Sequence, residues 1–76
     1  MARRSSTELR FTVDGSDKSY ADVGPALSHS VTLAARAMSA GVERTFYVRD
    51  SITGDTKGYS ECFEDGDTFV VQTRRT

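Results

Sequence analysis

One segment of the chain is long enough, and suitably punctuated, to form a helix: DVGPALSHSVTLAARAMSAG, residues 22–41. Asp22 is the expected N-cap, because a start at Ser19 would place Pro25 in the helix interior, where proline removes a hydrogen bond and clashes with the preceding turn. Gly41 can supply the left-handed residue that ends many helices. At about 100° per residue, one face of this amphipathic helix collects the apolar side chains Val23, Leu27, Val31, Ala34, Ala35 and Met38.

The segments on either side of this helix have the pattern of strands. ELRFTV at 8–13 alternates apolar and polar residues, which is typical of a half-buried strand, and DGSD ends it. KSY at 18–20 is short enough to leave open whether it folds back as a second strand. After the helix, RTFYVRD, GYSECF and TFVVQTR are separated by the turns SITGDTK and EDGD, where Gly54 and Gly66 suit positive φ angles. This pattern predicts a three-stranded meander.

The register of the meander decides which side chains reach the core. A three-residue loop at 53–55 would pair Phe46 with Cys62, and a two-residue turn at Asp65 and Gly66 would pair Cys62 with Phe69. A slip of one residue would turn Glu61 toward the helix, so we exclude it. The expected core face contains Phe46, Val48, Ser60, Cys62, Phe69 and Val71. The expected outer face contains Tyr47, Arg49, Tyr59, Glu61, Val70 and Gln72.

Together these elements predict an α+β fold, with a single helix packed on one face of a three- to five-stranded, mainly antiparallel sheet in the order βαβββ or ββαβββ. A right-handed crossover would carry the chain from the first strand over the helix to the next one. The first and last strands would then run parallel. Residues 1–7 are small, polar and basic without periodicity, which predicts a flexible basic arm before a single domain at residues 8–76.

Size and composition restrict the class of protein. A chain of 76 residues supports one small core, and 37% hydrophobic with 28% charged residues is typical of a soluble domain. No apolar run approaches the roughly 20 residues that span a bilayer, so no membrane partner is expected. A single cysteine cannot form an internal disulfide, and a reducing, cytoplasmic location fits. The net charge of −1 gives no overall attraction to nucleic acid.

Catalytic, metal and cofactor sites find little support in the sequence. TGDTKG at 53–58 lacks the Gly-Lys-Ser/Thr order and the following helix of a phosphate loop, so it reads as a hairpin turn. Cys62 is expected in the core, where free cysteines are commonly buried and unreactive, while His29 should lie in solvent on the far side of the helix. The acidic turns match no zinc or calcium pattern. We therefore expect a non-enzymatic protein with no cofactor and no metal.

The outer face of the sheet is the surface with functional potential. Tyr47, Arg49 and Tyr59 should lie together with Glu61 and Gln72, and tyrosine and arginine are enriched among interface hot spots. Arg10 extends this expected partner-binding set on the first strand. An ordinary solvated face is the alternative, because tyrosine favours strands and cross-strand pairs stabilise a sheet without any partner.

Two classes of partner fit such a face. A protein partner would use the Tyr and Arg anchors or a free sheet edge, and a homo-oligomer is compatible with this reading. A single-stranded nucleic acid would stack its bases on the tyrosines. The expected parallel first and last strands would place the N-terminal arginines and Arg74 and Arg75 at opposite ends of the sheet. This arrangement leaves no continuous basic groove and favours the protein partner.

In size, in its preference for arginine over lysine, and in the Asp-x-x-Thr-Gly hairpin from Asp50 to Gly54, the chain resembles many small uncharacterised proteins of actinobacteria and their bacteriophages. This resemblance of style extends over the whole chain. It implies a small accessory protein in the host cytoplasm that binds and modulates a larger host or viral protein. It implies no catalytic residues.

Overall fold

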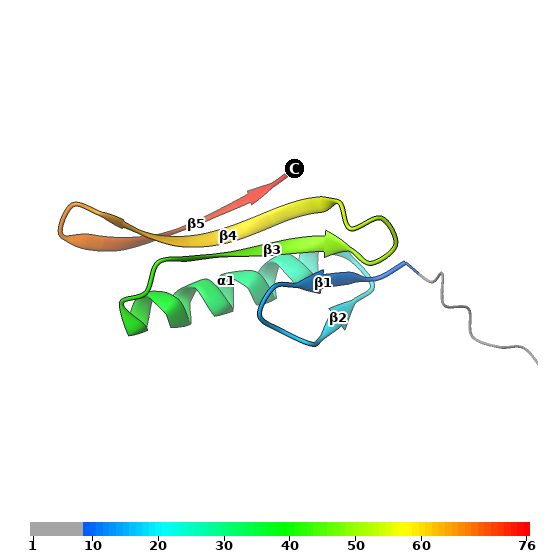
Figure 1. Ribbon diagram of the computed structural model, residues 1–76, viewed down its shortest axis with the longest axis horizontal. Coiled ribbons are helices and arrows are strands. Elements are labelled where there is room, and N and C mark those ends of the chain that lie inside the picture. The colour runs from blue at the N-terminus through cyan, green and yellow to red at the C-terminus, as the bar shows by residue number, and fades with distance from the viewer. Residues whose placement is uncertain (1–8) are drawn as a thin grey trace, which may run out of the picture.

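The computed structural model describes residues 9–76 and contains one helix packed against one face of an open five-stranded sheet (Figure 1). The expected flexible arm at residues 1–7 lies outside the described residues. The elements follow in the order β1 (Phe11–Val13), β2 (Ser19–Tyr20), α1 (Val23–Ala40), β3 (Arg44–Asp50), β4 (Thr56–Asp65) and β5 (Thr68–Arg75). The strand order across the sheet is β2-β1-β3-β4-β5, and every neighbouring pair is antiparallel. The α+β prediction is confirmed in its ββαβββ form.

The direction of β1 differs from the prediction. β1 pairs antiparallel with β3, with Phe11 opposite Asp50 and Val13 opposite Val48. The short β2 forms the return strand, so the connection over the helix starts from β2 and not from β1. β1 and β5 therefore run antiparallel. The start of β1 and the end of β5 lie at the same end of the sheet, where β3 also ends (Figure 1).

The boundaries of α1 agree with the sequence. Asp22 precedes the helix in an extended conformation, at φ −132° and ψ 158°, and Pro25 lies in the first turn. At the other end Gly41 adopts φ 70°, and the amide of Val42 donates to the carbonyl of Ala37 at 2.9 Å. This bond satisfies a carbonyl that the helix leaves without a partner, and it requires the left-handed residue that glycine provides.

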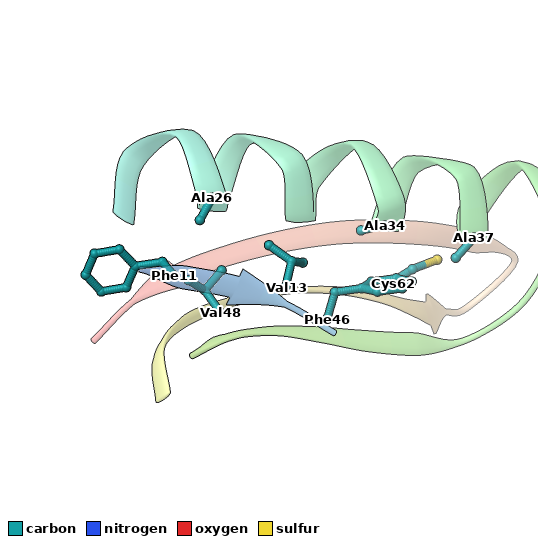
Figure 2. Packing of buried hydrophobic residues seen from close by; sticks show 8 residues of the cluster. All are labelled: Phe11, Val13, Ala26, Ala34, Ala37, Phe46, Val48 and Cys62. Carbon is teal, nitrogen blue, oxygen red and sulfur yellow. The ribbon is translucent and has the colours of Figure 1, made fainter. Parts of the chain in front are cut away.

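The buried face of α1 is rotated away from the predicted one. The side chains in full contact with the sheet are small, and Val31 and Met38, expected in the core, are 38% and 39% exposed. The reason is steric: Val13, Phe46 and Val48 rise from the sheet and fill the layer, so the helix packs closely with residues that have little bulk (Figure 2). The buried helix residues are Ala26, Ser30, Ala34 and Ala37.

The sheet contributes most of the core volume. Phe46 is 4% exposed and Val48 is fully buried, while Cys62 lies beneath the helix with its sulfur directed toward Ala37 (Figure 2). The predicted burial of Cys62 is confirmed. Phe69 and Val71 pack against this cluster but remain half-buried, because they lie on the edge strand β5.

Both hairpins have the predicted faces, but their registers are shifted by two residues. Phe46 pairs with Ser60 and not with Cys62, and Cys62 pairs with Val71 and not with Phe69. The second turn has Gly66 and Asp67 at its centre, since Asp65 pairs with Thr68. A shift of two leaves every side chain on its own face, which is why the face prediction is correct although the register prediction is wrong.

The side chain of Asp50 explains the shift in the first hairpin. Its Oδ1 atom accepts hydrogen bonds from the amides of Ile52 and Thr53 at 2.7 and 3.1 Å, and these bonds lower the pKa of the carboxyl. The amide of Asp50 donates to the carbonyl of Asp55 at 2.9 Å, so the turn occupies residues 51–54. Gly54 takes φ 80° as its last residue. An aspartate that binds the amides following it starts a turn earlier than the glycine alone indicates.

A chain of three hydroxyl groups crosses the interface between helix and sheet. Ser30 Oγ donates to the carbonyl of Leu27 at 2.7 Å and lies 2.7 Å from Ser60 Oγ, which lies 2.8 Å from Thr73 Oγ1. Because a hydroxyl has one proton, Ser60 must donate to Ser30 and accept from Thr73. Ser30 and Ser60 are completely buried, and this chain satisfies both.

We expect the two serines to be energetically coupled. Ser30→Ala and Ser60→Ala should each lower the free energy of unfolding by about 1 kcal/mol, since each leaves a buried polar group with one partner fewer. The double mutant should lose less than the sum, by about 0.5 kcal/mol or more. Urea unfolding of the four proteins measures this coupling, and Thr32→Ala, which removes an exposed hydroxyl, is the control. Strictly additive losses would contradict the coupling.

Candidate functional site

The helix-free face of the sheet brings two tyrosines together. Tyr47 on β3 lies directly opposite Tyr59 on β4, and their ring centroids are 5.8 Å apart at an interplanar angle of 58°. This tilted arrangement is favourable for aromatic rings. Tyr47 is 36% exposed and Tyr59 is half-buried, so the pair presents an aromatic surface to solvent. The predicted juxtaposition of these residues is confirmed.

Arg49 contacts both the Tyr47 ring and the carboxylate of Asp14. Its guanidinium carbon lies 5.2 Å from the centre of the Tyr47 ring. Its Nε and Nη2 atoms donate to the two carboxylate oxygens of Asp14 at 3.1 and 3.2 Å. The hydrogen bonds and the negative charge of Asp14 raise the pKa of Arg49, which stays charged. The side chains are 43% and 40% exposed, and an ion pair of this kind contributes about 0–1 kcal/mol of stability.

Arg74 also belongs to this face, although it was not predicted among the site residues. The observed register sets Arg74 of β5 opposite Tyr59, and Gln72 opposite Glu61. With the predicted register, Gln72 would have been opposite Tyr59. The shift of two residues in the hairpin therefore brings an exposed guanidinium beside the tyrosines. The acidic turn residue Asp14 was also missed, because its contact with Arg49 depends on the antiparallel pairing of β1 and β3.

Arg10 does not join the cluster. It precedes β1, and its side chain reaches toward β2, where Nε donates to Ser19 Oγ at 3.1 Å and Nη2 donates to the Ser19 carbonyl at 3.0 Å. These bonds hold Arg10 at the β2 side of the sheet, away from Tyr59. The prediction that Arg10 extends the tyrosine cluster is therefore wrong. The residues that lie together, which we call the tyrosine face, are Asp14, Tyr47, Arg49, Tyr59, Glu61, Gln72 and Arg74.

The charged side chains of the tyrosine face sum to no net charge. Arg49 and Arg74 supply two positive charges, and Asp14 and Glu61 supply two negative charges. By strand alternation, the half-buried Phe63 and Val70, directly paired across β4 and β5, continue the same face toward the end of the hairpin. Phe63 was not predicted as a site residue, although strand alternation from Tyr59 and Glu61 places it on this face. An aromatic and apolar floor with balanced charges suits contact with a protein surface.

His29 and Cys62 lie in different surroundings. His29 Nε2 is 3.1 Å from Ser16 Oγ, and its ring centroid is 5.8 Å from that of Tyr20. The histidine is half-buried against the β1–β2 ribbon, so the prediction of a simple solvated residue is wrong. Its position results from the rotation of α1, which turns His29 toward β2. Cys62 lies in the core with Ala37 above it (Figure 2).

A shallow groove runs between α1 and the turn that follows β1. It consists of two adjoining hollows of about 290 and 560 Å³, which share Gly15, Leu33 and Arg36. Within residues 9–76, no three His, Cys, Asp or Glu side chains gather as a metal site requires. Among residues 9–76, no helix is both long enough and apolar enough to cross a bilayer.

The chain matches no protein-family model, no curated protein and no solved structure. The function of the tyrosine face is therefore inferred from the chemistry of its own residues.

Proposed function

We propose that the chain is a small non-enzymatic binding module that recognises another protein with its tyrosine face. The observation that carries this proposal is the bidentate contact of Arg49 with Asp14 beside the Tyr47 and Tyr59 pair. The carboxylate of Asp14 balances the positive charge of Arg49, and the two hydrogen bonds hold the guanidinium in place over Tyr47. A rigid aromatic and arginine anchor of this kind is common among the residues that dominate protein interfaces.

The chemistry of the face describes its partner. Tyr47, Tyr59 and the neighbouring Phe63 favour an apolar or aromatic side chain. Arg74, which has no carboxylate opposite it on β4, favours an acidic side chain. The partner segment that fits best therefore contains both kinds of residue. The resemblance to small proteins of actinobacteria and their phages suggests a larger host or viral protein as the source of that segment.

Capture from an actinobacterial lysate tests the proposal. The immobilised chain should retain a protein partner, and the double substitution Tyr47→Ala with Arg49→Ala should reduce capture at least about tenfold, because truncation of a hot-spot residue costs about 2 kcal/mol or more. Thr32→Ala with Arg36→Ala, two exposed helix residues, is the matched control and should bind like wild type. Nuclease treatment should leave capture unchanged. Equal capture by the double mutant and wild type would show that the tyrosine face is only a solvated surface.

A single-stranded nucleic acid is the second candidate partner, and one observation favours it. Arg10, Arg74 and Arg75 lie toward the same end of the sheet, contrary to the separation expected from the sequence. Bases could then stack on Tyr47 and Tyr59 while these arginines contact phosphates. Against this reading, Arg49 is already engaged by Asp14, and Glu61 would repel the phosphate chain.

Tyrosine fluorescence separates the two candidates. The chain has no tryptophan and three tyrosines, and Tyr47 and Tyr59 lie on the tyrosine face while Tyr20 packs against the core. Titration with oligodeoxythymidylate should leave the emission unchanged if the partner is a protein. Strong quenching that weakens steeply with salt, and is lost in Tyr47→Phe with Tyr59→Ala but retained in Tyr20→Phe, would establish nucleic-acid binding instead.

A further inference from the structure

We propose that β5 pairs antiparallel with β5 of a second copy of the chain, so that two five-stranded sheets join across a two-fold axis at Val71. This contact uses the edge of the sheet and does not depend on the tyrosine face. β5 has β4 on one side and no strand on the other among residues 9–76.

The hydrogen-bond pattern of β5 leaves its outer edge available. The amide of Thr76 donates to the carbonyl of Lys57 at 3.2 Å, which fixes the alternation along the strand. Residues an even number of positions from Thr76 bond to β4, and the others direct their amide and carbonyl groups to the free edge. The residues with outward groups are Phe69, Val71, Thr73 and Arg75.

This edge lacks the protection that sheet edges usually have. Long edge strands in monomeric proteins are commonly interrupted by proline, lysine or a bulge, because their free backbone groups otherwise pair with another chain. β5 contains no proline and no lysine, and its pairing with β4 continues without a break from Asp65 to Gly58. The opposite edge strand, β2, is only two residues long, so its shortness protects that side.

An apolar surface accompanies the open edge. A Cβ atom on Gly58 of β4 would lie 2.9 Å from Leu27 Cδ2 and 2.8 Å from the carbonyl oxygen of Arg74 on β5. Leu27 therefore lies on the side of α1 that faces β5. Val31 and Met38 follow on the same side at helical spacing and are 38% and 39% exposed. Below them, Phe69 and Val71 of β5 are half-buried. A two-fold axis perpendicular to the sheet keeps both helices on one face, so these side chains would meet their counterparts.

The opposite charges at the two ends of β5 favour a second copy of the chain as the partner, and they favour one register of pairing. β5 begins beside the acidic turn with Asp65 and Asp67 and ends at Arg74 and Arg75. Antiparallel self-pairing centred on Val71 sets Asp67 opposite Arg75 of the second copy, and this ion pair occurs twice because of the symmetry. Moving the register by two residues in one direction places Phe69 opposite Arg75, and in the other direction places Thr73 opposite Asp67. Only the register centred on Val71 pairs the opposite charges directly.

Sedimentation equilibrium of the purified full chain tests the inference. The 8.3 kDa chain should form a dimer of twice that mass. Asp67→Arg and Arg75→Asp should each raise the dimer dissociation constant by about tenfold or more, because each places like charges together twice. The combined exchange Asp67→Arg with Arg75→Asp should restore dimerisation. Both residues are exposed, so the variants should fold, which circular dichroism verifies.

Amide hydrogen exchange at low and high protein concentration provides a second measurement. Protection of the Val71 amide, which points outward, should rise with concentration, while that of Gln72, which bonds to β4, should stay constant. A chain that remains monomeric up to about 1 mM, where association would be weaker than about −4 kcal/mol, would overturn the inference. A dimer that the single substitutions do not weaken, or that the combined exchange does not restore, would also overturn it.

Discussion

Replacing Phe46 with alanine should lower the free energy of unfolding by about 3–5 kcal/mol, the range for a buried phenylalanine. Phe46 is 4% exposed at the centre of the sheet and belongs to the cluster beneath α1. A chain of 76 residues has a total stability of roughly 4–11 kcal/mol, so this loss removes much of it. The melting temperature should fall by more than about 10 °C.

The control for this prediction is the next residue in the sequence. Tyr47 lies on the opposite face and is 36% exposed, so Tyr47→Ala should cost much less than Phe46→Ala. Phe69→Ala should also cost less, because Phe69 is only half-buried on the edge strand. Thermal melts of the three variants provide the comparison. Equal losses at positions 46 and 47 would contradict the assignment of the two faces.

Gly58→Ala should destabilise the protein by about 1–3 kcal/mol, as overpacking of a well-packed site usually does. A Cβ atom at this position would lie 2.8 Å from the carbonyl oxygen of Arg74 and 2.9 Å from Leu27 Cδ2. The first contact is with backbone and cannot be relieved by a change of rotamer. Either β5 or α1 would have to move away from β4.

Gly24→Ala is the matched control. Gly24 lies in the first turn of α1, and a Cβ atom there would have no neighbour within 4 Å. Alanine favours the helix by up to about 1 kcal/mol relative to glycine, so this substitution should be neutral or slightly stabilising. Denaturant unfolding measures both changes. A neutral Gly58→Ala would mean that α1 and β5 are less closely packed than the structure indicates.

Local signals in the sequence predicted the boundaries of α1 and the two faces of the sheet. Pro25 and Gly41 mark the ends of α1 because each tolerates one backbone geometry that other residues disfavour. Strand alternation placed Phe46 and Tyr47 on opposite faces, and an error of two residues in register leaves that assignment intact.

Features that depend on distant contacts were not predictable in the same way. The buried face of α1 was taken from the largest apolar residues, yet Ala26 and Ser30 face the sheet because its own side chains fill the layer. The direction of β1 depended on β2, whose two residues carry almost no pattern. The contacts of Asp14 with Arg49, and of Arg74 with Tyr59, follow from these long-range pairings and from the exact turn positions.

The antiparallel placement of β1 between β2 and β3 also affects the order in which the chain can assemble. Arg10 and Ser51 are hydrogen-bonded although they are 41 positions apart, and β1 has only the two-residue β2 as an earlier neighbour. An isolated two-stranded hairpin is marginally stable in water. At about 5–20 residues per second, synthesis leaves β1 without its main partner for roughly 2–8 s. β1 is the first strand of the chain, yet it can join the sheet only after the complete β3 strand, up to Asp50, has been synthesised.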